Sequence, residues 1–359
     1  MARKPDGPLR RGWTTGACAT AATKAAYTAL LTGAFPDPVS IRLPKGEEPA
    51  FPLTCEARGD GWAMAAIVKD AGDDPDVTHG ATIQVTVKAA DPGAGVVFRA
   101  GEGVGTVTKA GLPIPPNESA INPVPRRMMA EVVMEVAVAH GGSGDVVIEI
   151  AVPGGEALAA KTWNPRLGIV GGLSILGTTG VVVPFSCAAW IHSIHRGIDV
   201  ARAAGLDRVA ACTGSTSEAA VATLYELPEF GFLDMGDFAG GLLKYLRAHP
   251  IPKLTIGGGF GKLTKLAQGA LDLHSGRSQV DFDWLAEKVA ALGGEPEVAH
   301  HANTANEVLG RAMAAGLPLA DAVAAEARKT ALGVLDGASV TVEVLVIDRA
   351  GVVVGRAGG

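Results

Sequence analysis

Cysteine is scarce in this chain of 359 residues, which contains four. They are Cys18, Cys55, Cys187 and Cys212, and no two of them form a Cys-x-x-Cys pair. This spacing excludes a zinc ribbon, a redox dithiol motif and a small fold held together by disulfides. We expect four reduced side chains, most of them buried.

An excess of basic residues is also lacking, since 31 lysines and arginines stand against 37 acidic residues, for a net charge of −6. That balance disfavours a broad nucleic-acid-binding surface, although a local basic pocket is compatible with it. Apolar residues make up 48% of the chain, which is not the composition of a disordered protein. We expect about two domains with real cores, and the sequence leaves the oligomeric state open, a homo-oligomer included.

The chain has no uninterrupted apolar run suited to a signal peptide or a membrane span. Threonines break the apolar stretch that follows the basic N-terminal residues. The segment from Leu167 to Ile191 carries no charged side chain, but its glycines and Pro184 favour short buried strands joined by turns. We therefore expect a cytoplasmic protein with no membrane partner.

Glycine is abundant at 48 residues, and the pattern between the glycines changes along the chain. The first half has strand-like alternation near 83–87, 96–98 and 146–150, and helical spacing near 17–31 and 127–139. From about residue 200, short apolar strands alternate with glycine turns and amphipathic helices, which is typical of a parallel sheet. The sequence predicts an α/β protein with an α+β domain at 1–155 and a Rossmann-like layered α/β domain at 156–359. The closing strand pattern near 340–346 fits either domain.

The glycine segment at Gly257, Gly258, Gly259 and Gly261 follows a predicted strand and opens a predicted helix. Glycines let backbone N–H groups approach an anion or an adenosine closely. The segment is not a phosphate P-loop, because Leu263 occupies the position of the Ser or Thr that follows the lysine. A tight strand-to-helix turn that needs glycine for packing explains the pattern equally well.

Two pairs of cations stand where helices are predicted to begin, an unfavourable place for positive charge unless an anion binds there. Lys262 and Lys265 share one helical face, and Arg126-Arg127 follows an extended Asn-Pro-Val-Pro segment. Taken singly, each cation fits a solvent-exposed position just as well. Two such places in one acidic protein favour a polyanionic ligand.

Other polar residues give weaker indications. His192 and His195 share a helical face without a carboxylate close enough to complete a metal set, so we expect no resident metal. Asp272 and His274 could supply acid–base groups, or could simply end a helix before a turn. Ser215, three residues before Glu218, is expected to cap a helix.

Four segments together resemble the CbiD family. They are GWTTGACATAA at 12–22, AINPVPR at 120–126, NPRLGIVGGLSILGTTG at 164–180 and GKLTKLA at 261–267. The resemblance implies a cobalamin-pathway enzyme that methylates C-1 of cobalt-precorrin-5B with S-adenosylmethionine, giving cobalt-precorrin-6A. Many relatives carry Tyr at the position of Trp13, and His-Ile near Gly259-Phe260. Because of the second difference we expect the glycine backbone, and not the side chain near 259–260, to contact the donor.

Methyl transfer to a carboxylate-rich macrocycle needs alignment of two reactants and no enzyme nucleophile. Under this hypothesis the glycines at 257, 258, 259 and 261 bind the donor, and Asp272 or His274 moves a proton. Guanidinium and ammonium groups would clamp the corrinoid carboxylates; the candidates are Arg126, Arg127, Arg166, Lys262 and Lys265. Two alternatives are a non-catalytic tetrapyrrole carrier, which needs the same cations but no donor site, and nucleotide-dependent chemistry at 257–262.

Overall fold

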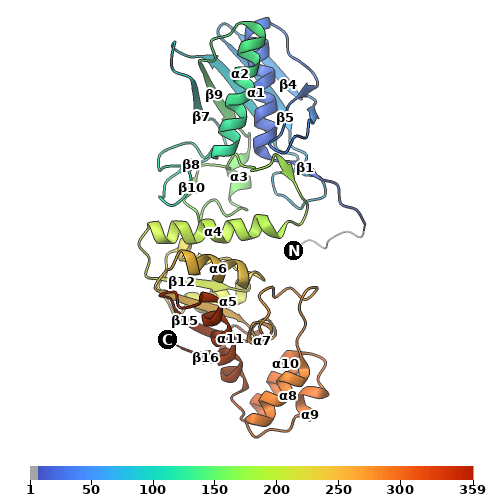
Figure 1. Ribbon diagram of the computed structural model, residues 1–359, viewed down its shortest axis with the longest axis vertical. Helices are drawn as coiled ribbons and strands as arrows, with labels where there is room; N and C mark the ends of the chain where they lie inside the picture. Colours follow the sequence, from blue (N-terminus) through green and yellow to red (C-terminus); the bar gives the residue numbers. More distant parts are fainter. Residues whose placement is uncertain (1–6, 359) are drawn as a thin grey trace. The chain divides into compact units, whose positions relative to one another are not determined.

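The computed structural model describes residues 7–358, and its chain divides into two compact units, Met1–Ser186 and Cys187–Gly359 (Figure 1). Residues 1–6, part of the segment examined for a signal peptide, lie outside the described residues. The predicted domain boundary at 155 is corrected to 186. Residues beyond 155 belong to unit 1 because two short strands there, β10 (Ile169–Val170) and β11 (Val181–Val182), pair with β8 (Thr106–Val107) and β1 (Gly12–Trp13).

Unit 1 is built on a five-stranded sheet in the order β4-β5-β6-β9-β7. All neighbours are antiparallel except β7 and β9, which run parallel. The strands of this sheet are β4 (Cys55–Gly59), β5 (Trp62–Val68), β6 (Thr82–Ala89), β7 (Val96–Ala100) and β9 (Val146–Ala151). The remaining elements of the unit are α1 (Thr15–Thr32), β2 (Val39–Ser40), β3 (Ala50–Phe51), α2 (Pro123–His140) and α3 (Gly155–Ala159).

Helix α1 lies beside α2 and packs on strands β5 and β6 (Figure 1). Its many alanines are buried because small side chains let the helix approach both neighbours closely. The hydroxyl of Thr14 accepts a hydrogen bond from the backbone N–H of Ala17 at 3.1 Å and so caps the helix. Gly33, at φ 82°, ends it in the left-handed conformation.

Helix α2 begins at Pro123, four residues earlier than the helical spacing near 127–139 indicated. The two prolines of the Asn-Pro-Val-Pro segment lie in the first turn, where a helix needs no N–H donor. The interpretation of this segment as extended is therefore wrong beyond Asn122, which is the N-cap. Arg126 and Arg127 lie in the second turn of α2 and not at its first residues.

Unit 2 is built on a sheet in the order β13-β12-β14-β15-β16. The first four strands are parallel and β16 is antiparallel, so the closing strands stay in unit 2. The strands are β12 (Arg208–Cys212), β13 (Phe232–Leu233), β14 (Lys253–Gly259), β15 (Thr341–Ile347) and β16 (Val353–Ala357). The helices are α4 (Cys187–Ala203), α5 (Ser215–Ala222), the 3₁₀ turn η1 (Glu229–Gly231), α6 (Ala239–Ala248), α7 (Phe260–Ala267), α8 (Phe282–Ala291), α9 (Glu297–His300), α10 (Ala305–Ala314) and α11 (Leu319–Leu335).

The two faces of the unit 2 sheet are covered unequally. Val209 and Ala211 point into a large core shared with α4, α6, α7 and α11. Ala210 and Cys212 point to the other face, where α5 supplies Ala220 and Val221. The architecture is thus mixed α/β, with a mostly antiparallel sheet in unit 1 and a largely parallel sheet in unit 2.

Two local expectations in unit 2 are corrected. Ser215 is the first residue of α5 and its side chain does not cap the helix, because Gly214 occupies the N-cap and the hydroxyl of Ser217 donates to its carbonyl. Asp272 and His274 lie in a loop beyond α7, which already ends at Ala267. Within residues 7–358, no helix is both long enough and apolar enough to cross a bilayer.

Candidate functional site

The parallel strands of unit 2 end at one edge, which we call the carboxyl edge: residues 213–214 after β12, 234–238 after β13 and 257–262 at the end of β14. Helix α5, which follows β12, covers one face of the sheet, and α7, which follows β14, covers the other. The chain therefore leaves two neighbouring strands in opposite directions. In open parallel sheets this is the position at which ligands bind.

The glycines of the carboxyl edge fall into two pairs. Gly257 and Gly258 belong to β14, and a Cβ on them would lie 2.7 Å from Val221 Cγ2 and 2.8 Å from Thr213 Cγ2. Packing alone therefore demands glycine at both positions. At Gly259 and Gly261 the nearest atoms to a Cβ would be 4.0 and 3.8 Å away, so no neighbour within the unit demands glycine there.

Lys262 connects the three segments of the carboxyl edge. Its Nζ donates to the carbonyl of Thr213 at 2.9 Å and lies 3.0 Å from Oδ1 of Asp237. Thr213 follows β12, Asp237 follows β13, and Lys262 itself lies in the first turn of α7. The ammonium predicted to clamp a substrate thus has two partners inside unit 2.

Lys265 holds the loop beyond α7. The side chain is buried, and its Nζ donates to the carbonyls of Leu273 and Ser278. Burial lowers the pKa of Lys265, while the charge of Asp237 opposes that shift. The loop carrying Asp272 and His274 is consequently tied to the helix that follows the glycines.

Asp272 and His274 differ in their environments. Asp272 forms an ion pair with Arg277 and accepts the N–H of His274 at 3.0 Å. Burial raises the pKa of Asp272, but these bonds outweigh it and leave the pKa below its usual value. His274 is exposed, and its Nδ1 accepts the N–H of Gly276 at 3.1 Å. Its imidazole is therefore the more accessible of the two groups.

The three predicted arginines lie in unit 1, whereas the two lysines lie in unit 2. Arg126 pairs with Glu118 at 2.8 Å and donates to the carbonyl of Ile121 at 2.8 Å. Arg127, 61% exposed, lies 3.9 Å from Glu131 one turn along α2. Arg166 places its guanidinium 5.3 Å from the ring centre of Trp163. Arg127 is thus the most exposed of the three arginines.

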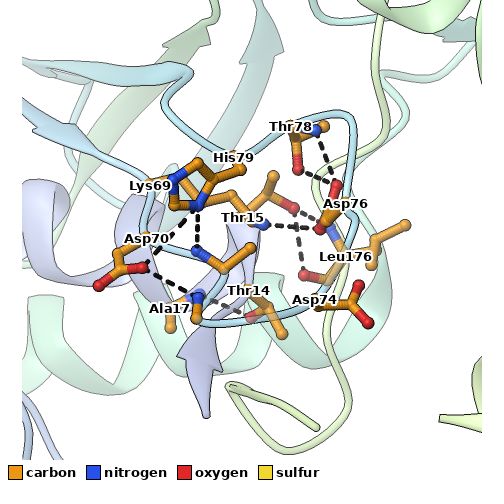
Figure 2. Close-up of polar contacts among 12 residues, drawn as sticks. Thr14, Thr15, Ala17, Lys69, Asp70, Asp74, Asp76, Thr78, His79 and Leu176 are labelled. Carbon is orange, nitrogen blue, oxygen red and sulfur yellow. Dashed lines mark hydrogen bonds and ion pairs between the residues drawn. The ribbon is translucent and has the colours of Figure 1, made fainter. Parts of the chain in front are cut away.

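Unit 1 contains a second polar cluster, at the start of α1 (Figure 2). The hydroxyl of Thr15 donates to the carbonyl of Leu176 at 3.2 Å and accepts its N–H at 3.0 Å. Beside it, Nζ of Lys69 contacts Asp76 at 2.7 Å, and the lysine side chain is 1% exposed. This buried ion pair lies in the loop between β5 and β6, residues 69–81.

Close backbone approach fastens that loop to the residues before α1. A Cβ on Gly12 would lie 2.0 Å from the backbone of Ala71, and one on Gly72 would lie 2.2 Å from the carbonyl oxygen of Arg10. The guanidinium of Arg10 also pairs with Asp70. The sequence interpretation overlooked this loop, although its four aspartates, at 70, 73, 74 and 76, follow directly on a strand.

Asp74, in the same loop, holds the end of unit 1. Its Oδ1 accepts the N–H of Phe185 at 2.7 Å, and Phe185 has a φ of +56°. Burial raises the pKa of Asp74, although the hydrogen bond from Phe185 works in the other direction. Among residues 7–358, no three His, Cys, Asp or Glu side chains are grouped so that they could hold a metal ion.

Comparison with known proteins identifies the family to which this chain is similar. The CbiD family model matches residues 2–184, and the model of the CbiD C-terminal domain matches residues 272–358. A cobalt-precorrin-5B C(1)-methyltransferase of Brucella anthropi is 68% identical over 97% of this chain and 95% of its own length. One of Brucella abortus, with the same name, is 67% identical over the same shares.

One solved structure, a cobalamin biosynthesis protein (cbiD) from Archaeoglobus fulgidus, is also similar. It is 25% identical, covers 87% of this chain and 86% of its own, and has a TM-score of 0.41. Two family models and relatives of this similarity leave one assignment: the chain belongs to the CbiD family.

Proposed function

We infer that this chain is the enzyme that transfers a methyl group from S-adenosylmethionine to C-1 of cobalt-precorrin-5B, giving cobalt-precorrin-6A in cobalamin biosynthesis. The observation that carries this inference is the 68% identity to a protein of that name over 97% of the chain. The cytoplasmic location stays a prediction.

The carboxyl edge of unit 2 is the proposed donor site, and unit 2 is proposed to be a Rossmann-like layered domain. Gly257 and Gly258 shape the strand end, while a Cβ on Gly259 or Gly261 would meet no atom closer than 3.8 Å, so their neighbours do not explain the glycines. A buried carboxylate, Asp237, stands at the same edge and suits a ligand that carries hydroxyl groups and positive charge. When bound, S-adenosylmethionine supplies an electrophilic methyl group on a sulfonium that leaves as a neutral thioether.

The corrinoid is held through its carboxylates, and Arg127 is the first candidate clamp because its guanidinium is exposed and loosely paired. Arg126 and Arg166 lie in the same unit and are proposed to extend the clamp. Lys262 and Lys265 stay predictions as substrate contacts, since both ammonium groups already bond within unit 2. The protein's contribution to rate is chiefly alignment of the two reactants, which lowers a barrier by roughly 7–11 kcal/mol in favourable cases.

His274 is the proposed acceptor for any proton that the macrocycle releases after methylation. It is exposed, and histidine is the side chain that most often transfers protons in enzymes. Asp272 acts through the backbone, because its carboxylate accepts the N–H of His274 while paired with Arg277. We assign it the role of a positioning residue.

Two measurements test the proposed function. Isothermal titration with S-adenosylhomocysteine should show one binding site per chain. Incubation with S-adenosylmethionine and the corrinoid should then yield a product heavier by one methyl group. Corrinoid binding with neither donor binding nor a mass gain would contradict the proposal and indicate a tetrapyrrole carrier.

A further inference from the structure

Asp237 is a buried carboxylate whose position is fixed by the backbone around it. The residue is 7% exposed and lies in the segment that follows β13. The preceding residue, Gly236, donates its N–H to the carbonyl of Cys212 at 3.1 Å, and the carbonyl of Asp237 accepts the N–H of Leu273 at 2.8 Å. Strand β12 and the loop beyond α7 therefore hold Asp237 from two sides.

One oxygen of this carboxylate lacks a proper hydrogen bond. Oδ1 is buried, and within residues 7–358 no donor meets it at hydrogen-bond geometry. Nζ of Lys262 lies only 3.0 Å away, so the two charges attract, but the ammonium directs a bond to the carbonyl of Thr213. Lys265 and Arg277 are also near enough for their charges to interact with Asp237. The carboxylate is thus neutralised by its surroundings without being fully hydrogen-bonded.

A buried carboxylate oxygen without a donor is costly, and native proteins keep few of them. Lys262 covers this oxygen with a side chain that is 38% exposed. Binding of a ligand at Oδ1 requires this partly exposed side chain to withdraw from that oxygen. A ligand with a hydroxyl group can then reach the oxygen and supply the missing bond.

We propose that Asp237 accepts a hydrogen bond from a ribose hydroxyl of the adenosyl donor. The proposal rests on the proposed methyltransferase function and names the residue that recognises the sugar. In dinucleotide-binding Rossmann domains, an acidic residue about 20 positions beyond the glycine-rich turn of the first strand bonds the ribose. Asp237 follows β13, the neighbour of β12, but β12 is followed by a single glycine, Gly214, which lies 237 − 214 = 23 positions before Asp237.

The test measures the affinity of the chain for two ligands, S-adenosylhomocysteine and 5′-methylthioadenosine. Both contain the ribose, but only S-adenosylhomocysteine has an amino-acid group. We expect Asp237→Asn to weaken both by the same factor, about tenfold or more, since a bond to a charged acceptor becomes one to a neutral amide. Loss of affinity for S-adenosylhomocysteine alone would place the contact on the α-ammonium group and overturn the ribose assignment. Unchanged affinity for both ligands would overturn it as well.

Glu343→Gln is the matched control. Glu343 is a buried carboxylate of the same sheet, paired with Arg208 at 3.4 Å, but it lies near the start of β15, away from the carboxyl edge. Its replacement should lower stability and leave both affinities unchanged. If the wild-type chain binds neither ligand, the donor site itself is refuted and the assignment of Asp237 falls with it. If the wild type binds and Asp237→Asn binds equally well, only the assignment falls.

Discussion

At the scale of single residues, each predicted cation is distinguished by what it already contacts. Arg126 has a carboxylate and two backbone carbonyls as partners, whereas Arg127 faces solvent beside a distant glutamate. A side chain with several internal partners stabilises the fold, and a loosely paired one is available to a ligand. This contrast separates two neighbouring arginines that look equivalent in the sequence.

Replacing the two arginines by alanine should therefore differ in its main effect, which is on stability for Arg126 and on corrinoid binding for Arg127. Arg126→Ala should lower the free energy of unfolding by about 1–3 kcal/mol, because its partners in the 118–121 segment lose their donor. Arg127→Ala should change stability by no more than about 0.5 kcal/mol but raise KM for the corrinoid about tenfold, with donor affinity unchanged. Urea denaturation and steady-state kinetics measure both quantities. An unaltered KM in Arg127→Ala would remove Arg127 from the clamp.

Asp74 gives a pH-dependent prediction. Burial raises the pKa of Asp74 in the folded state above the usual value of 3.8. At pH values between 3.8 and this raised pKa, the folded protein therefore binds more protons than the unfolded protein. The free energy of unfolding therefore falls as pH rises through this window and stays lower above it. Asp74→Asn has no such charge and keeps an oxygen that accepts from Phe185. The variant should be more stable than the wild type at neutral pH and equally stable below about pH 3.

Denaturation midpoints of the wild type and Asp74→Asn over that pH range measure the difference. Because the other titrating groups are common to both proteins, their contributions cancel at each pH. A wild type more stable than the variant at neutral pH would show that the charge of Asp74 is favourable where it lies.

At the scale of elements, the glycines at the end of β14 have different roles: some are needed for packing, and others are proposed to bind the ligand. Gly258 has Thr213 beside it, whereas Gly259 has open space. Gly261 lies in the first turn of α7, where alanine is the better helix former. Packing within unit 2 therefore explains the glycine at 258, but it does not explain the glycines at 259 and 261.

Alanine substitutions should separate these roles. Gly258→Ala should lower stability by about 1–3 kcal/mol, because the new Cβ overlaps Thr213. Gly261→Ala should raise it by up to about 1 kcal/mol through helix propensity. Gly259→Ala should leave stability nearly unchanged and weaken binding of S-adenosylhomocysteine. Thermal unfolding and calorimetric titration test all three, and full donor affinity in Gly259→Ala would argue against backbone contact at that glycine.

Helices and strands whose apolar residues recur at regular spacing were predictable from the sequence, and elements too short to show such spacing were not. The alanine-rich helical pattern near 17–31 located α1, and the spacing of valines near 127–139 located most of α2. Strands β10 and β11 have two residues each, too few to show alternation, and their partners lie far away in the sequence. The domain boundary was misplaced for that reason.

The candidate site was predictable where its signal is local. Glycines at a strand end identified the carboxyl edge, but Asp237 was missed because an aspartate in a short loop usually faces solvent. Its burial depends on Lys262 and on the loop around Leu273, which only the tertiary structure brings together. The Lys69–Asp76 pair was missed in the same way, since a run of aspartates is typical of an exposed loop.

At the scale of the whole molecule, the donor is proposed to bind to unit 2, and the arginines proposed to hold the corrinoid lie in unit 1. Each unit has its own core, so substitutions in one should leave the other's stability intact. Both proposals require that the adenosyl donor binds at the carboxyl edge of the parallel sheet.

The decisive measurement is a crystal structure of the full chain with S-adenosylhomocysteine. We expect density for the ligand beside Gly259, with a ribose hydroxyl within hydrogen-bond distance of Asp237. Density at the start of α1 in unit 1, beside Thr15 and Lys69, with the carboxyl edge of unit 2 empty, would contradict it.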